Sequence, residues 1–218
     1  MSRKAELSEN ILAAKLEGTL EWLYERRVHA LVSLGVVVAA GLIGSVFVLR
    51  RNEQAEDAQT KIAYAQSMIS QQQFPQAETV LSEVRAGASG SDTARMGAYL
   101  SGVSAFDQGK LDDAVKFFTA AIDQSAGHPV RPLARSGLGT ALEAKKDYEG
   151  AIADYAAFIS ETPDHFLSPR IQLALGRAYL LAGKNDEAKK ALEHLIDQFP
   201  TSEWAENARR LMDKNKTH

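Results

Sequence analysis

The sequence predicts an all-α protein in which one N-terminal transmembrane helix precedes a solenoid of helical hairpins. Three observations support this fold class. Four alanines recur at intervals of 37 residues: Ala77, Ala114, Ala151 and Ala188. A small residue stands 12 positions before each of them: Ala65, Gly102, Gly139 and Gly176. Such a period is typical of stacked repeats, and a separate run of 20 uncharged residues lies nearer the N-terminus.

The uncharged run, residues 30–49, predicts the transmembrane helix. At about 1.5 Å per residue it would cross the roughly 30 Å hydrocarbon layer of a bilayer. A cleaved signal peptide has a shorter apolar core and a small-residue cleavage site, whereas Arg50 and Arg51 follow this run and 29 residues precede it. The alternative of a buried core helix is disfavoured because no other segment is apolar enough to surround it.

Residues 1–29 are expected to form a cytoplasmic amphipathic head. Apolar residues recur there near helical spacing: Ile11, Leu12, Leu16, Leu20 and Leu23. The head is either an interfacial helix or a helical extension of the anchor, and the pattern leaves both open. Basic residues close to the two ends of the anchor are equal in number, and Arg3 and Lys4 favour a cytoplasmic N-terminus. This distribution predicts a single-pass protein of the bacterial inner membrane whose repeat domain lies in the periplasm.

Small residues inside the anchor are spaced so that a second helix can approach closely. This transmembrane packing face comprises Gly35, Ala39, Ala40, Gly41, Gly44 and Ser45. The alternative is that they only reflect the general frequency of small residues in membrane helices.

Composition excludes several function classes. The chain has no cysteine, which rules out disulfides, thiolate metal sites and a lipid-modified cysteine. From residue 52 onward 23 acidic residues outnumber 18 basic ones, which argues against nucleic-acid binding.

Four helix pairs and a terminal helix are expected after a linker at residues 50–58, within a repeat domain that spans residues 59–213 and leaves a tail at 214–218. The pairs are 59–71 with 74–85, 93–108 with 111–124, 132–145 with 148–161, and 169–182 with 186–198. A last helix, residues 202–213, should cap the stack through Trp204 and Leu211. The small residues should allow close helix approach, and the large residues four positions after each alanine should fill the space between units: Leu81, Phe118, Tyr155 and Leu192.

The repeats resemble the tetratricopeptide (TPR) family. The fourth unit carries the family pattern most fully, at Leu175, Gly176, Tyr179, Ala188, Leu192 and Pro200. The layout of anchor and repeats, with phrases at 128–135 and 198–203, is similar to the YfgM-like proteins of the bacterial inner membrane. That resemblance implies association with the Sec translocon and with periplasmic chaperones.

The TPR resemblance also implies a concave, protein-binding groove lined by the first helix of each unit. The corresponding residues are Met96, Tyr99, Val103, Phe106, Leu133, Ser136, Thr140, Glu143, Arg170, Leu173, Arg177 and Leu180. This mixture suits an extended or helical peptide, with the two arginines available for a carboxylate. The alternative is that the larger apolar members are core or cap contacts and that the arginines form a solvated face.

Enzyme motifs are missing. The Gly87–Ser91 phrase lacks the final glycine of a nucleophile elbow, and the histidines show no metal-ligand spacing. We therefore expect no catalytic site, metal or cofactor, protein partners in place of a small-molecule substrate or nucleic acid, and the function of a membrane-anchored adaptor or scaffold. A cytosol-facing receptor and a structural accessory subunit of a membrane complex are the alternatives.

Overall fold

The structure is a computed structural model that describes residues 27–87, 91–123 and 127–215. Within the helix that begins at Arg27, the side chains of residues 27–31, 34, 47 and 50–55 lie outside this description. The chain separates into two compact units, Met1–Glu56 and Asp57–His218. Each unit is considered by itself.

Helix α2 (Arg27–Ser70) contains both the predicted anchor and the predicted linker. The head predicted at residues 1–29 lies outside the described residues up to residue 26. In the part of the chain that the structure describes, no helix combines the length and the apolar character needed to cross a membrane. The transmembrane helix predicted at residues 30–49 is therefore not supported, although these residues are helical.

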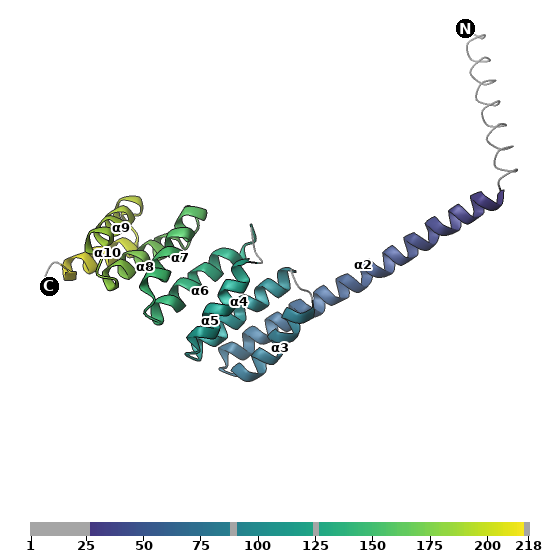
Figure 1. The fold of residues 1–218 in the computed structure, drawn as a ribbon, viewed down its shortest axis with the longest axis horizontal. Helices are drawn as coiled ribbons and strands as arrows, with labels where there is room; N and C mark the ends of the chain where they lie inside the picture. Colours follow the sequence, from purple (N-terminus) through teal and green to yellow (C-terminus); the bar gives the residue numbers. More distant parts are fainter. Residues whose placement is uncertain (1–26, 88–90, 124–126, 216–218) are drawn as a thin grey trace, which may run out of the picture. The chain divides into compact units, whose positions relative to one another are not determined.

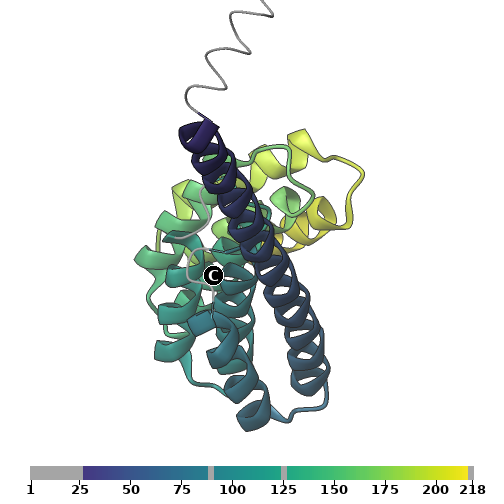
Figure 2. The ribbon, with the colours of Figure 1, turned by 90° about the vertical axis from the view of Figure 1, so that its right-hand side faces the viewer.

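The second unit is a series of antiparallel helical hairpins (Figure 1). The end of α2 pairs with α3, because Ala65 and Leu81 share one buried cluster, and Figure 2 shows the two running side by side. The remaining helices are α3 (Phe74–Gly87), α4 (Asp92–Asp107), α5 (Leu111–Asp123), α6 (Val130–Ala144), α7 (Tyr148–Glu161), α8 (Ser168–Leu181), α9 (Asn185–Gln198) and α10 (Glu203–Asn215). The first helix begins at Arg27 and not at residue 59, so the linker predicted at residues 50–58 is helical; the other predicted helices are confirmed to within a few residues at each end.

The repeated small residues lie where the two helices of a hairpin touch. All four repeated alanines are fully buried. A Cβ atom added at Gly139 would lie 2.2 Å from Tyr155, and one added at Gly176 would lie 2.4 Å from Leu192. A side chain at these positions would therefore push the helices apart.

The large residues were predicted to fill the space between units, and each of them shares a buried cluster with a residue of the following unit or of α10. Leu81, Phe118, Tyr155 and Leu192 are all buried. Tyr155 and Leu192 pack on the glycine of their own hairpin. Phe118 contacts its own unit and the next one, because a Cβ atom added at Gly102 or at Gly137 would lie 2.6 Å from its ring. In the three hairpins that carry the repeated glycine, the large side chain thus also packs on the glycine of its own hairpin.

The turn inside each hairpin contains a residue in the left-handed conformation. The residues with this conformation again stand 37 positions apart: Gln72 (φ 60°), Gly109 (φ 71°), Lys146 (φ 63°) and Gly183 (φ 76°). The residue after each closes the preceding helix, as when the Lys110 N–H donates to the Ala105 carbonyl at 2.9 Å. Two of the four turns thus place a side chain in a conformation that favours glycine.

Helix α10 covers the end of the stack, as predicted. Trp204 and Leu211 pack against a cluster that contains Leu192 and Leu195. Its polar side chains lie on the opposite, exposed face: Glu203, Glu206, Arg209 and Arg210. The last hairpin therefore has no bare apolar end.

Candidate protein-binding groove

Seven of the twelve predicted groove residues line one cavity of about 310 Å³. We call it the groove cavity. Its walls come from α4, α5, α6 and the start of α8: Tyr99, Val103, Phe106, Phe118, Leu133, Ser136, Gly137, Thr140, Phe166, Leu167 and Arg170. Three successive hairpins therefore contribute to a single site.

The two longer walls are the faces of two first helices. Tyr99, Val103 and Phe106 follow helical spacing on α4, and Leu133, Ser136 and Thr140 do so on α6. Residues spaced in this way share one helix face, and a seven-residue separation spans about 10 Å. Helices α4 and α6 are in contact and run in the same direction, since α5 returns the chain between them. The cavity is thus a channel about two helical turns long.

The walls of this channel are mostly apolar. Ser136 is buried, and the Thr140 hydroxyl donates to the Ser136 carbonyl at 2.8 Å. Tyr99 is half-buried, and its burial raises its pKa, while the positive charge of Arg170 acts in the opposite direction. Arg170 is the one charged residue among those that line the cavity.

An exposed aromatic ring at the cavity was missed by the sequence reasoning. Phe166 lies between α7 and α8 and is 76% exposed. The centre of its ring lies 4.5 Å from that of His165, with the two rings tilted by 34°. The His165 ring in turn lies edge-on to the buried Phe158 ring, with the ring centres 5.6 Å apart. Phe166 lies in the connection between two hairpins and not on a first helix, so the repeat pattern gives no signal for it.

The two predicted arginines behave differently, which corrects the expectation that both are available. The Arg177 side chain donates from Nε and Nη2 to the two carboxylate oxygens of Glu143 at 2.7 and 3.0 Å. This bidentate pair ties α8 to α6 and occupies both side chains. Arg170 is exposed and has no ion pair with any residue that the structure describes.

The other predicted groove residues lie away from the cavity. Met96 packs against the first hairpin, and Leu173 packs against the C-terminal cluster. Met96 is thus a core contact, as the alternative held, and Tyr99 and Phe106 pack against buried clusters as well as lining the cavity. Glu143, Arg177 and Leu180 are also absent from the cavity walls.

The predicted transmembrane packing face remains a prediction. Its six small residues lie on the exposed part of α2, and a Cβ atom added at Gly35, Gly41 or Gly44 would meet nothing within 4 Å.

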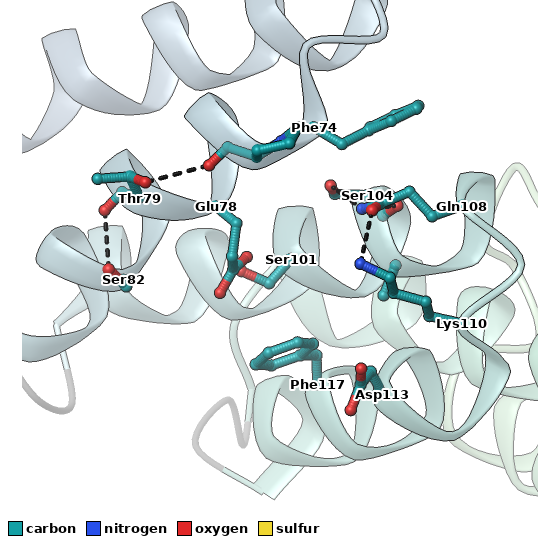
Figure 3. A pocket seen from close by; sticks show the side chains of 12 residues that line it. Phe74, Glu78, Thr79, Ser82, Ser101, Ser104, Gln108, Lys110, Asp113 and Phe117 are labelled. Atoms are coloured by element: carbon teal, nitrogen blue, oxygen red, sulfur yellow. Dashed lines mark hydrogen bonds between the residues drawn. The ribbon is translucent and has the colours of Figure 1, made fainter.

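A second and larger cavity lies between α3, α4 and α5 (Figure 3). We call it the hairpin cavity. Its volume is about 470 Å³, and it is lined by Phe74, Pro75, Glu78, Thr79, Ser82, Ser101, Ser104, Ala105, Gln108, Lys110, Asp113 and Phe117. None of these residues was predicted as part of a site.

Most of the charged groups around the hairpin cavity already have partners. The Arg85 guanidinium lies 2.6 Å from the carboxylate of Glu78 and 4.7 Å from the centre of the Phe117 ring, and it donates to Ser101. Lys110 donates to the Gln108 side chain at 2.8 Å, as Figure 3 shows. Two of the three charged side chains that line this cavity, Glu78 and Lys110, are therefore already bound within the chain.

Helices α6 and α7 share an ion network outside both cavities. Arg135 lies 2.7 Å from Asp154 and 2.6 Å from Glu161, and Arg131 lies 2.9 Å from Glu161. Burial raises the pKa of Asp154 to about 6 against the opposing effect of Arg135. Hydrogen bonds from Arg131 and Arg135 lower the pKa of Glu161 to about 2. The network joins the two helices of the third hairpin.

Among the described residues, no group of three histidine, aspartate or glutamate side chains is arranged to hold a metal ion.

Comparison with known families identifies the fold. The profile of a family described as tetratricopeptide repeat-like domain matches residues 23–213. The chain belongs to this family. This repeat fold is typical of proteins that bind other proteins and is not typical of enzymes.

Two solved structures are similar to this TPR-like chain. A putative kinesin light chain from Podosopora anserina with nearly identical TPR-like repeats aligns with a TM-score of 0.61 at 16% identity, over 72% of this chain and 83% of its own. Residues 41 to the end of MamA from Desulfovibrio magneticus RS-1 align with a TM-score of 0.58 at 19% identity, over 73% and 88%. These likenesses concern the fold. A comparison with curated protein sequences finds no match.

Proposed function

We propose that this TPR-like protein is an adaptor that binds a segment of a partner protein in the groove cavity. One observation carries the proposal: three successive hairpins build an apolar channel whose lining includes an exposed phenylalanine and an arginine that forms no ion pair with any described residue. Phe166 leaves most of its ring in water, and burying it against a partner would recover a large apolar surface. Interfaces commonly depend on a few such aromatic and arginine side chains.

The test is photo-crosslinking from position 166 in the full-length protein in its membrane. A photo-reactive amino acid replaces Phe166, and the matched control places it at Leu181, an exposed apolar residue of α8 that is 48% exposed and lies outside the groove cavity. The adaptor proposal expects a discrete crosslinked product from position 166 and none from position 181. Identical products from both positions, or none from position 166, would contradict it.

We further propose that residues 30–49 anchor the protein in the bacterial inner membrane, with the repeat domain in the periplasm. The support is the 20-residue run without charge and the exposure of its side chains. Nine large aliphatic residues between Val32 and Leu49 are each at least half exposed, and lipid chains would cover such a surface. By resemblance to the YfgM-like proteins, the partners would be the Sec translocon and periplasmic chaperones.

Two alternatives keep the fold but change the role. A cytosol-facing receptor would be digested by added protease only after lysis of the inner membrane, whereas a periplasmic domain would be digested in intact spheroplasts. A structural subunit held by its anchor would lose its partners when residues 1–51 are exchanged for an unrelated membrane anchor. An adaptor that binds through the groove cavity would retain them.

A further inference from the structure

We infer that the groove cavity recognises an amphipathic helical segment whose apolar stripe is accompanied by an aspartate or glutamate side chain. This inference rests on the proposed function and specifies the chemistry of the partner.

The shape of the cavity favours a helix. Its two long walls are parallel helix faces, each about two turns long, carrying Tyr99, Val103 and Phe106 on one side and Leu133, Ser136 and Thr140 on the other. An amphipathic helix presents apolar side chains at positions i, i+3 or i+4, and i+7, which is the same length and spacing. The exposed ring of Phe166 extends the apolar wall toward the partner.

The charge at the cavity favours an acidic partner. No aspartate or glutamate lines the cavity, and Arg170 is its one charged residue. The half-buried Tyr99 phenol lies within the electrostatic influence of Arg170. A carboxylate placed beside Arg170 would form a charge-assisted hydrogen bond next to an apolar surface, where such a bond is stronger than in open water.

Arg170 differs from four other arginines of the repeat domain, and Arg209 and Arg210, which also form no ion pair among the described residues, lie on α10 and outside the groove cavity. Arg85, Arg131, Arg135 and Arg177 each hold a carboxylate of this chain within 3 Å. Acidic residues outnumber basic ones after residue 52, so carboxylates are plentiful in this domain. No ion pair joins one of them to Arg170 among the described residues. The positive charge at the groove is thus left for a carboxylate supplied from outside.

The test is a selection of random 16-residue peptides displayed on phage against the full-length protein in lipid nanodiscs. Each peptide is fused to the coat protein through its C-terminus, so only side chains supply carboxylates. Parallel selections use Arg170→Glu, and use Arg210→Glu as a control with the same change of charge at an exposed site on α10. Fluorescence anisotropy then measures the affinity of enriched peptides for each protein.

We expect the wild type and Arg210→Glu to enrich peptides with apolar residues at helical spacing and a neighbouring acid. Arg170→Glu should bind these peptides about tenfold more weakly, the size expected for loss of one charge-assisted hydrogen bond, and should enrich lysine or arginine in place of the acid.

Other outcomes distinguish a failure of the acidic-helix inference from a failure of the proposed function. Enrichment of apolar peptides without acids, with equal affinity for Arg170→Glu, would overturn the acidic partner and leave the groove as the binding site. Enriched peptides whose affinity is unchanged by Phe106→Ala and Phe166→Ala, or no enrichment at all, would contradict the proposed function itself. A concentration-dependent dimer that Thr140→Trp dissociates would identify the occupant as a second copy and overturn the inference.

Discussion

The groove cavity and the hairpin cavity share helices α4 and α5 in their walls, yet they differ in chemistry. Tyr99, Val103 and Phe106 face the groove cavity, whereas Ser101 and Ser104 face the hairpin cavity. The hairpin cavity is larger, at about 470 Å³ against about 310 Å³, but Glu78 and Lys110 on its walls are bound to neighbouring side chains. The groove cavity has apolar walls, an exposed ring and an unpaired arginine. The exposed Phe166 ring and the Arg170 guanidinium, and not the cavity volume, distinguish the candidate site.

The largest expected effect tests whether the repeated glycines hold both cavities in shape. Gly102 lies on α4 against Phe118, which itself lines the groove cavity. Gly102→Leu should lower the free energy of unfolding by about 3 kcal/mol, because its side chain would overlap the Phe118 ring. Chemical denaturation measures this loss. Ala153→Leu, at an exposed position on α7, should change stability little, and equal losses would show that the glycine contact is not special.

The next prediction uses a matched pair of threonines to compare the cavities directly. Thr140 in the groove cavity and Thr79 in the hairpin cavity each donate to the carbonyl four residues earlier, at 2.8 and 3.1 Å. Thr140→Trp should weaken binding of a selected peptide about tenfold or more, because the indole fills the channel. Thr79→Trp should leave the affinity unchanged. Fluorescence anisotropy titrations measure the peptide affinity of both variants. A greater loss of affinity in Thr79→Trp than in Thr140→Trp would assign binding to the hairpin cavity.

A smaller effect is expected from the ion network of α6 and α7, which should influence the pH dependence of stability and not peptide binding. The raised pKa of Asp154, about 6 in the folded protein against an ordinary 3.8, means that the folded state holds this proton more tightly. Its contribution to the free energy of unfolding is fully present below about pH 4 and is lost as pH rises through 6.

Asp154→Asn should remove this dependence, as measured by unfolding between pH 4.5 and 6.5. Glu161 does not interfere in this range. Its lowered pKa, about 2 against an ordinary 4.5, makes its contribution disappear only as pH falls below 4.5. A pH profile of the Asp154→Asn protein that still declines between 4.5 and 6.5 would show that another group is responsible.

The smallest expected effect concerns the hairpin turns, to which no binding role is assigned. Lys146→Gly removes a side chain from a left-handed conformation and should stabilise the fold by about 0.5 kcal/mol, since the gain is partly offset by a more flexible unfolded chain. Gly109→Ala, at the equivalent turn with φ 71°, should have the opposite sign. Thermal unfolding compares them, and peptide affinity should stay the same in both.

The sequence predicted the helices well because the 37-residue period marks the contacts that every hairpin repeats. It predicted the groove only partly, because non-repeated contacts decide which side chains stay free. Arg177 and Glu143 stand 34 residues apart on neighbouring first helices, and their pairing depends on how two units stack. Phe166 lies in a connection with no repeat counterpart. The left-handed turn residues Gln72 and Lys146 are not glycines, so the sequence does not indicate their conformation.

The most direct test of the account is methyl NMR of the full-length protein during titration with a selected peptide. The methyl groups of Thr140, Val103 and Leu133 report on the groove cavity, and those of Thr79 and Ala105 report on the hairpin cavity. The account predicts shifts for the first group that saturate with the peptide, and little change for the second. Shifts concentrated at Thr79 and Ala105 would contradict the assignment of binding to the groove cavity.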